Sequence, residues 1–213
     1  MILGLTGSIG MGKSASTRAF ARHGAAIWDA DAEVHRLMAR RGAAVAAVTA
    51  AFPDARTEDA GGVAVDRRIL GKLVFGDAAA LRRLEAILHP MVRHAERHFL
   101  GVAERRRCRL AVLDIPLLFE TGGETRCDAT AVVSAPEFVQ RARVLARPGM
   151  TKSKYDTLLA RQIPDREKCR RADFVIRTGL NKRVSERTSR RIAEILLARR
   201  GTHWPICWPA MAS

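Results

Sequence analysis

Gly7-Ser8-Ile9-Gly10-Met11-Gly12-Lys13-Ser14 is the most informative stretch of this 213-residue sequence. It fits the pattern G-x-x-x-x-G-K-[ST]. The apolar residues 1–6 before it predict a short buried strand, and residues 15–23 after it predict a helix. A strand, a glycine-rich turn and a helix start in this order form a cradle of backbone N–H groups for phosphate. The stretch therefore predicts a phosphate site, with an ordinary glycine-rich turn as the alternative.

Two side chains of this stretch predict nucleotide chemistry. Lys13 is expected to reach the β- and γ-phosphates of a nucleotide, and the hydroxyl of Ser14 to ligate Mg²⁺. The helix that begins here turns its positive end toward the same phosphates. Both residues are therefore candidates for the functional site.

The composition is that of an ordinary globular domain. Hydrophobic residues make up 47% of the sequence and charged residues 28%. No apolar run is long enough to span a membrane, and the first residues have no basic segment before them, so we expect neither a membrane segment nor a signal peptide. The four cysteines are scattered without C-x-x-C spacing, which disfavours a zinc site or a disulfide framework and favours a reducing cytosol.

The formal net charge of +15 has two interpretations. An anionic partner such as nucleotide phosphate, nucleic acid or a membrane surface is one. The other is a general richness in arginine, because the positive charge is dispersed along the chain. Aromatic residues are only 5% of the sequence, so stacking platforms for bases are scarce and we expect no nucleic-acid partner.

Four further apolar segments predict strands, and they alternate with helical segments. This alternation predicts an α/β fold with a parallel sheet. The segment from about 42 to 100 is expected to be mainly helical, with Asp77 capping one helix and a new helix following His89-Pro90. The predicted strands after the first are residues 25–28, 109–114, 129–133 and 173–176.

Carboxylates follow two of these strands. Asp29-Ala30-Asp31 follows the second strand, and Asp114 ends the strand 109–114. Ligands bind beyond the carboxyl ends of parallel strands, so these carboxylates are expected near the phosphate cradle. The Asp114 segment has the form of a Walker B element, whose carboxylate lies near the metal. A helix is expected from 32 to about 41, and His35 shares a face of it with Asp31.

Several separate blocks together resemble the dephospho-CoA kinase family. The resemblance extends from Met1 to about Leu197. The glycine loop alone is shared by a very large class of proteins, whereas the combination of blocks is far more specific. The blocks are residues 4–14, Asp29-Ala30-Asp31, 67–75, 84–93 with His89-Pro90, 113–120, 140–147, Arg161-Gln162 and 172–176.

This resemblance implies a fold, a reaction and its ligands. It implies a P-loop NTPase-type three-layer fold over residues 1–200, with a helical acceptor-binding insertion at about 32–108, a helical lid at about 137–165 and a tail at 201–213. The implied reaction transfers the γ-phosphoryl group of ATP, with Mg²⁺, to the ribose 3′-hydroxyl of dephospho-CoA, giving CoA. The expected protein is a cytoplasmic monomer or weak homo-oligomer.

The resemblance also assigns roles to residues. Asp31, Lys13, Arg143 and Arg147 are expected to be catalytic, with Asp31 accepting the proton of the 3′-hydroxyl and the two arginines closing over the phosphates. ATP is expected to contact Gly7, Ser8, Gly10, Met11, Gly12, Lys13, Ser14, Ala15, Arg143 and Arg147. The acceptor is expected to contact Asp31, His35, His89, Arg93, Leu117 and Phe119, and the metal Ser14 and Asp114.

Each of these roles has a structural alternative. Asp31 can instead cap the following helix, a role that Asp29 can also take, and Asp114 can cap a turn. Arginines on an exposed helix are usually only solvated. His89 is more typical of a structural or orienting residue than of a base, and Leu117, Leu118 and Phe119 also fit a core.

Three features depart from the family pattern or have no counterpart in it. Ala15 stands where threonine is usual, and Arg177-Thr178-Gly179 stands where an Asp-Asn pair is common, so adenine contacts there are in doubt. The tail after about Arg200 either packs as an extended cover or is disordered. Competing functions are another small-molecule kinase, such as a nucleoside monophosphate kinase, and a basic ATP-binding protein that engages RNA or DNA.

Overall fold

The structure is a computed structural model that describes residues 1–59, 61–179 and 181–208. The chain forms two compact units, which we treat separately. The sheet unit comprises Met1–Asp29 and Leu100–Ser213, and the helical unit comprises Ala30–Phe99. Ala60, Leu180 and the last five residues of the predicted tail lie outside the described residues.

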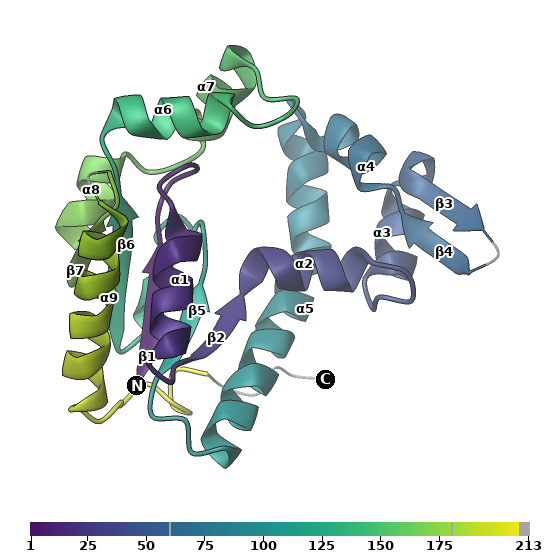
Figure 1. Cartoon of the computed structure of the whole chain (residues 1–213). Coiled ribbons are helices and arrows are strands. Elements are labelled where there is room, and N and C mark those ends of the chain that lie inside the picture. Colours follow the sequence, from purple (N-terminus) through teal and green to yellow (C-terminus); the bar gives the residue numbers. More distant parts are fainter. Residues whose placement is uncertain (60, 180, 209–213) are drawn as a thin grey trace. The chain divides into compact units, whose positions relative to one another are not determined.

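The sheet unit is built on a five-stranded parallel sheet (Figure 1). All four strand pairs are parallel, which confirms the predicted α/β class. The strands are nearly continuous apolar runs because both faces of a parallel sheet are covered. In spatial order they are β2 (Ala26–Asp29), β5 (Ala111–Asp114), β1 (Ile2–Thr6), β6 (Ala129–Ser134) and β7 (Phe174–Arg177).

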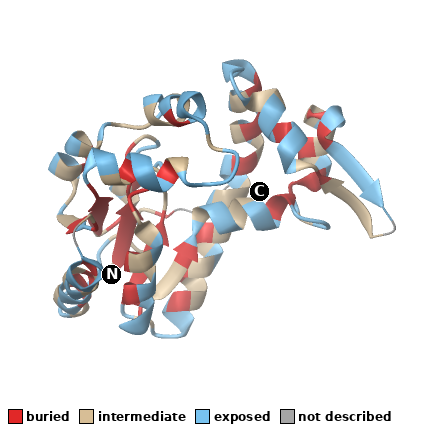
Figure 2. Ribbon diagram, turned by 45° about the horizontal axis from the view of Figure 1, so that its top comes forward, coloured by how far each residue is buried: buried red, intermediate tan, exposed pale blue. Residues whose placement is uncertain are grey.

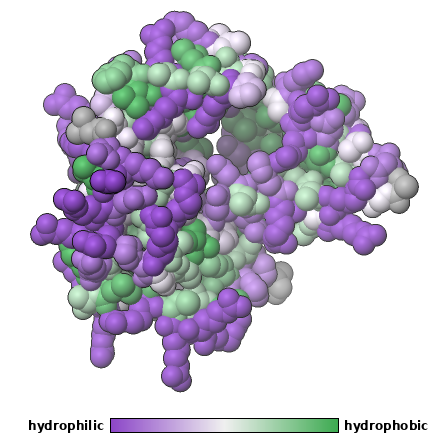
Figure 3. Space-filling view, viewed as in Figure 1, coloured by the Kyte–Doolittle hydropathy of each residue, from purple (hydrophilic) through white to green (hydrophobic). Residues whose placement is uncertain are grey.

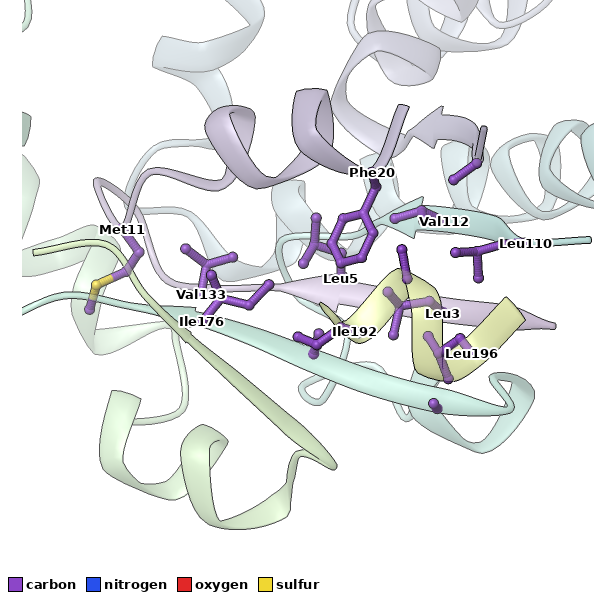
Figure 4. Close-up of a cluster of buried hydrophobic side chains, with 14 of the residues drawn as sticks. Leu3, Leu5, Met11, Phe20, Leu110, Val112, Val133, Ile176, Ile192 and Leu196 are labelled. Carbon is purple, nitrogen blue, oxygen red and sulfur yellow. The ribbon is translucent and has the colours of Figure 1, made fainter. Parts of the chain in front are cut away.

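Alternation along β1 divides its side chains between the two faces of the sheet. Leu3 and Leu5 are fully buried in a cluster with side chains of α1 (Lys13–Arg22) and α9 (Lys182–Leu197), as Figure 4 shows. On the opposite face, Gly4 lies so close to Leu118 that an added Cβ would be 2.7 Å from its Cδ2 atom. The glycine therefore lets the loop after β5 pack directly on the strand.

Three shorter helices complete the described secondary structure around the sheet, together with a 3₁₀ turn, η2 (Gly123–Arg126). Two of them, α6 (Glu137–Leu145) and α7 (Lys152–Ala160), occupy the predicted lid region. The third, α8 (Asp165–Arg171), has no counterpart among the predicted elements. Its sequence Asp-Arg-Glu-Lys-Cys-Arg-Arg lacks an apolar period, so only its acidic first turn and basic last turn indicate a helix.

The helical unit has its own apolar core, and two of its features correct the sequence prediction. Its mainly helical segment contains an antiparallel hairpin of β3 (Arg56–Asp59) and β4 (Gly62–Val65). All four residues of β3 are exposed, as its pale blue colour in Figure 2 shows. A strand with no buried face has no alternation, so periodicity gave no signal. The helices are α2 (Ala30–Met38), α3 (Val45–Ala51), α4 (Arg67–Val74) and α5 (Ala78–Arg105), with a 3₁₀ turn, η1 (Pro53–Ala55). The last residues of α5, from Leu100 on, belong to the sheet unit.

The second correction concerns Pro90. We expected a new helix after His89-Pro90, but α5 runs through both residues without a break. A proline inside a helix removes one backbone hydrogen bond. Leu84 and Leu88 are buried in the core of the helical unit, and their burial offsets that loss while Pro90 itself faces solvent. Asp77 caps α5 as predicted, accepting hydrogen bonds from the amides of Ala79 and Ala80 at 2.8 and 2.9 Å.

The described part of the tail packs on the sheet unit. Asp128, directly before β6, accepts hydrogen bonds from the amides of Thr202 (2.6 Å), His203 (3.0 Å) and Ile2 (2.7 Å). Trp208 is 4% exposed, and its indole N–H donates to the carbonyl of Arg126 at 3.0 Å. Residues 202–208 are therefore packed on the sheet unit, which is one of the two alternatives that the sequence left open for the tail.

Candidate active site

The predicted phosphate cradle is a loop, residues 7–14, that joins β1 to α1. Gly10 and Gly12 have φ angles of +80° and +88°, a left-handed region that side chains other than glycine rarely adopt. Helix α1 begins at Lys13, so its first-turn N–H groups face the loop. Ser8 and Met11 are buried under the loop, whereas Ser14 is exposed on it. The loop, which we call the phosphate loop, has the geometry expected from its glycines.

Lys13 and Asp114 form an ion pair beside this loop. Lys13 Nζ lies 3.1 Å from Asp114 Oδ1, and the two side chains are 17% and 10% exposed. The hydroxyl of Thr17, one turn along α1, donates to Asp114 Oδ2 at 3.0 Å. Burial raises the pKa of Asp114 above its ordinary value, and Lys13 and Thr17 oppose that rise. The predicted Walker B carboxylate and the loop lysine are thus brought together.

The residues at this end of the sheet fit a magnesium ion. Apart from the Lys13 ion pair, Asp114 Oδ1 has no hydrogen-bond partner in the described part of the chain. A carboxylate and a hydroxyl such as that of Ser14 are hard oxygen donors, and Mg²⁺ typically needs only one or two protein ligands because it keeps waters and phosphate oxygens. Among the described residues, no cluster of three or more His, Cys, Asp or Glu forms an all-protein metal site.

Two glutamines hold the backbone of Ile9 in the middle of the phosphate loop. Gln140 Nε2, from α6, donates to the carbonyl of Ile9 at 2.9 Å. The amide of Ile9 in turn donates to Gln162 Oε1 at 3.2 Å. Gln140 is only 4% exposed. The lid region therefore contacts the phosphate loop through two side chains that lie in blocks of the family resemblance but to which the sequence assigned no role.

Arg143 joins the same loop to the segment after β7. Its guanidinium donates to the carbonyls of Gly10 (3.4 Å) and Met11 (3.5 Å), and to the carbonyl of Thr178 (2.9 Å). The Thr178 hydroxyl also donates to the Met11 carbonyl. Thr178 stands where the sequence departs from the family pattern, and it connects the loop to that segment. Arg147 lies just beyond the end of α6 and, like Arg143, is exposed.

A buried ion pair holds the backbone next to Gln162. Glu120 Oε1 lies 2.8 Å from the Nζ atom of Lys168, whose side chain is 0% exposed. The same oxygen accepts a hydrogen bond from the amide of Ile163 at 2.8 Å. Glu120 lies in the loop between β5 and η2, and Lys168 belongs to α8. The pair therefore fixes the residue next to Gln162.

The apolar residues of the loop after β5 divide between core and surface. Leu118 is fully buried and Phe119 is 5% exposed, whereas Leu117 is 36% exposed. The guanidinium of Arg171 covers the Phe119 ring at 4.8 Å from its centroid. This packing favours the core alternative for Phe119. Contact of Leu117 or Phe119 with the acceptor stays a prediction.

The remaining predicted residues belong to the helical unit. Asp31 lies in the first turn of α2, which begins at Ala30 rather than at residue 32. Asp31 is therefore a helical residue and not the cap that precedes the helix. His35 follows one turn later, and His89 and Arg93 lie one turn apart on α5; all four side chains are exposed. Their roles toward an acceptor stay predictions.

Comparison with known proteins identifies the family. The family model described as dephospho-CoA kinase matches residues 1–182. A dephospho-CoA kinase of Paramagnetospirillum magneticum is 63% identical over 167 residues, covering 78% of this chain and 77% of that protein. A dephospho-CoA kinase of Rhodospirillum rubrum is 54% identical over 201 residues, covering 94% of this chain and 93% of that protein.

A solved structure agrees with the fold. The protein TT1252 from Thermus thermophilus has a TM-score of 0.74 and 35% identity, covering 92% of this chain and 97% of that one. The range that the family model matches includes the phosphate loop and Asp114. The chain belongs to the dephospho-CoA kinase family.

Proposed function

We propose that this protein transfers the γ-phosphoryl group of ATP to the ribose 3′-hydroxyl of dephospho-CoA, the last step in making CoA. The acceptor oxygen forms a bond to the γ-phosphorus while the bond to the β,γ-bridging oxygen breaks, and ADP leaves. The observation that carries the proposal is the Lys13–Asp114 pair beside the phosphate loop, in a chain of this family. Such a reaction asks the protein mainly for positioning and charge neutralisation.

The phosphate loop and its neighbours hold ATP in this proposal. Loop amides, Lys13 and the start of α1 bind the phosphates. Ser14 and Asp114 would hold Mg²⁺, which would neutralise charge on the phosphates. Arg143 already donates to the loop carbonyls, so its first role is to keep the loop in shape, and Arg147 is the arginine available to close over the phosphates.

Asp31 acts on the acceptor. The chain passes directly from Asp29, at the end of β2, to Asp31, and Asp29 is paired in register with Asp114. Two residues of chain span at most about 7 Å, so connectivity ties Asp31 to the strand end. As a carboxylate it accepts the proton of the 3′-hydroxyl, or holds that hydroxyl in line with the γ-phosphorus.

The cysteines and the helices bear on the setting of the protein. We expect a cytoplasmic protein, since all four cysteines are free thiols and a reducing compartment keeps them so. None of the described helices is both long and apolar enough to cross a bilayer. We expect a monomer or weak homo-oligomer that binds no nucleic acid.

An acceptor panel with purified protein tests the function. ADP release is measured with dephospho-CoA, its 3′-deoxy analogue and a set of nucleoside monophosphates. We expect rapid release with dephospho-CoA alone. Activity with nucleoside monophosphates and none with dephospho-CoA would assign a different kinase. In a parallel titration, tight and strongly salt-dependent binding of an oligonucleotide, without phosphorylation of any acceptor, would favour the nucleic-acid alternative.

A further inference from the structure

Both glutamines of the chain bind the same residue of the phosphate loop. The sequence contains only Gln140 and Gln162. Gln140 Nε2 donates to the carbonyl of Ile9 at 2.9 Å, and the amide of Ile9 donates to Gln162 Oε1 at 3.2 Å. A backbone N–H only donates and a carbonyl only accepts, so the backbone of Ile9 dictates which end of each carboxamide faces it. Gln140 therefore acts as a donor and Gln162 as an acceptor.

The two side chains come from different parts of the lid region. Gln140 belongs to α6, and Gln162 follows α7; in Figure 1 both helices lie at the same end of the sheet unit as the phosphate loop. Gln140 is 4% exposed and Gln162 is half-buried, so water does not easily replace these two hydrogen bonds. A carboxamide is also neutral. The two glutamines therefore hold the loop without adding charge beside the phosphates.

The backbone of α6 packs against the loop at the next residue, Gly10. A Cβ atom added to Gly10 would lie 2.5 Å from Val144 Cγ2 and 3.0 Å from the carbonyl oxygen of Gln140. Such distances leave no room for any side chain at this position, and the φ angle of +80° also favours glycine. The loop and α6 therefore fit together closely, and Ile9 cannot shift while its hydrogen bonds to the lid region are kept.

The amides of the loop divide into two groups. The amide of Ile9 is bound by Gln162, and the amide of Met11 donates to the carbonyl of Ser8 at 3.1 Å. Other loop amides have no hydrogen-bond partner among residues 1–59, 61–179 and 181–208, namely those of Gly10, Gly12, Lys13 and Ser14. Amides of this kind at a helix start are donors for phosphate oxygens. Binding of Ile9 by the glutamines thus leaves the phosphate donors available.

We infer that Gln140 and Gln162 are positioning residues for the phosphoryl donor. By holding Ile9 from both sides they keep the free amides of the loop in place before ATP binds. A loop that is already ordered loses less conformational entropy when its ligand binds, so ATP binds more tightly. The inference rests on the proposed function in taking ATP as the donor. It adds that the lid region contributes to ATP binding through the loop backbone, besides its arginines.

The test replaces each glutamine by methionine, which keeps the length of the side chain and removes the hydrogen bond. The β,γ-imido analogue of ATP, with Mg²⁺, is titrated calorimetrically into Gln140→Met, Gln162→Met and wild type without any acceptor. A neutral hydrogen bond is worth about a factor of 2–12 in an equilibrium constant, and each variant should weaken binding by about that factor. Because both glutamines act on Ile9, the double variant should lose less than the product of the two single losses.

Arg166→Met is the matched control. Arg166 is an exposed residue of α8, close to Gln162 in the sequence, and its replacement should leave the affinity for the analogue at the wild-type value. Steady-state kinetics add a second readout. In both glutamine variants the KM for ATP should rise, whereas kcat and the KM for dephospho-CoA should stay within about twofold of wild type, because binding rather than the chemical step is affected. A merely structural role would lower the thermal unfolding midpoint without this selective rise.

Hydrogen exchange of the Ile9 amide, followed by NMR in the free protein, tests the contact itself. Gln162→Met should speed this exchange about 2- to 12-fold, and Arg166→Met should not. Unchanged affinity for the analogue in both glutamine variants, an equal loss in Arg166→Met, or unchanged exchange of the Ile9 amide overturns the inference. The titration and the exchange keep their meaning whichever acceptor the protein phosphorylates. Gln162 is only half-buried, so its variant decides the question if Gln140→Met fails to fold.

Discussion

Lys13 and Asp114 stand 101 positions apart in the sequence and 3.1 Å apart in the fold. The parallel register of the strands explains why the two side chains are close. Leu5 of β1 pairs with Asp114 of β5, and the phosphate loop starts just beyond β1. The carboxylate keeps the ammonium beside the loop, and Thr17 keeps the carboxylate in place. Burial makes this carboxylate harder to ionise than a free one, so a charged partner is needed.

Removing the charge of Lys13 tests its role at the phosphates. Lys13→Ala should lower kcat by about 10²–10³-fold, because preorganised charge at the transferring phosphates is lost. The measurement is the initial rate at saturating ATP and dephospho-CoA. Lys154→Ala, which removes an exposed lysine of α7, is the control and should stay near the wild-type rate. Near-normal turnover by Lys13→Ala would refute its assigned role.

Helix α8 and the loop after β5 show how one element positions another. Their Lys168–Glu120 pair is buried, and a buried charge without its partner typically costs about 3–5 kcal/mol. We expect Lys168→Met to lower the free energy of unfolding by that amount and to weaken ATP binding through Gln162. The double variant Lys168→Met/Glu120→Gln should regain much of the stability, because glutamine still accepts from the amide of Ile163 without a buried charge.

Urea unfolding measures the free energy of unfolding of these variants. A substitution in an exposed ion pair of the same unit is the control. Lys152 and Asp156 pair at 2.9 Å on the surface of α7, with side chains 69% and 53% exposed. Lys152→Met should change the free energy of unfolding by less than about 1 kcal/mol. If Lys168→Met were equally mild, the buried pair would not be fixing Gln162.

The elements that the sequence predicted well are those with a local signal. The apolar strands, the glycines of the phosphate loop and the carboxylates at strand ends all follow from short patterns. The polar strand β3 and helix α8 lack an apolar period, and Pro90 is tolerated because burial of Leu88 outweighs a lost hydrogen bond. Gln162 contacts Ile9 across 153 positions, so no local pattern signals its role.

Most of the positive charge of the molecule is spread over its surface. Figure 3 shows hydrophilic side chains over most of the visible face. The buried apolar side chains form two separate cores. One lies between the sheet and helices α1 and α9, and the other lies within the helical unit. The chain leaves the sheet unit after Asp29 and returns at Leu100. Four predicted acceptor residues, Asp31, His35, His89 and Arg93, therefore lie in the helical unit, whereas Leu117 and Phe119 lie in the sheet unit with the nucleotide residues.

Asp128 is the residue on which the described tail depends. Burial raises its pKa, but hydrogen bonds from the amides of Thr202, Ile2 and His203 outweigh burial and hold the pKa below its ordinary value. A lowered pKa in the folded state stabilises the protein above the unfolded pKa of about 3.9, and this stabilisation is lost as the pH falls through the folded value.

We therefore expect Asp128→Asn to lower the free energy of unfolding at pH 7 by about 1–3 kcal/mol. Urea unfolding at several pH values measures the difference between wild type and variant. That difference should shrink below about pH 4, where the wild-type carboxylate also becomes protonated. A difference that stays constant down to pH 3 would show that the charge of Asp128 does not hold the tail.

The most direct test of the account is the single-turnover rate of Asp31→Asn beside its dissociation constant for ATP. Asparagine keeps the shape of the side chain but cannot accept the proton of the 3′-hydroxyl. We predict a rate about 10²–10⁴-fold below wild type, with an ATP dissociation constant within about twofold of it. A normal rate at saturating substrates, with ATP affinity lost instead, would contradict the assignment of Asp31 to the acceptor.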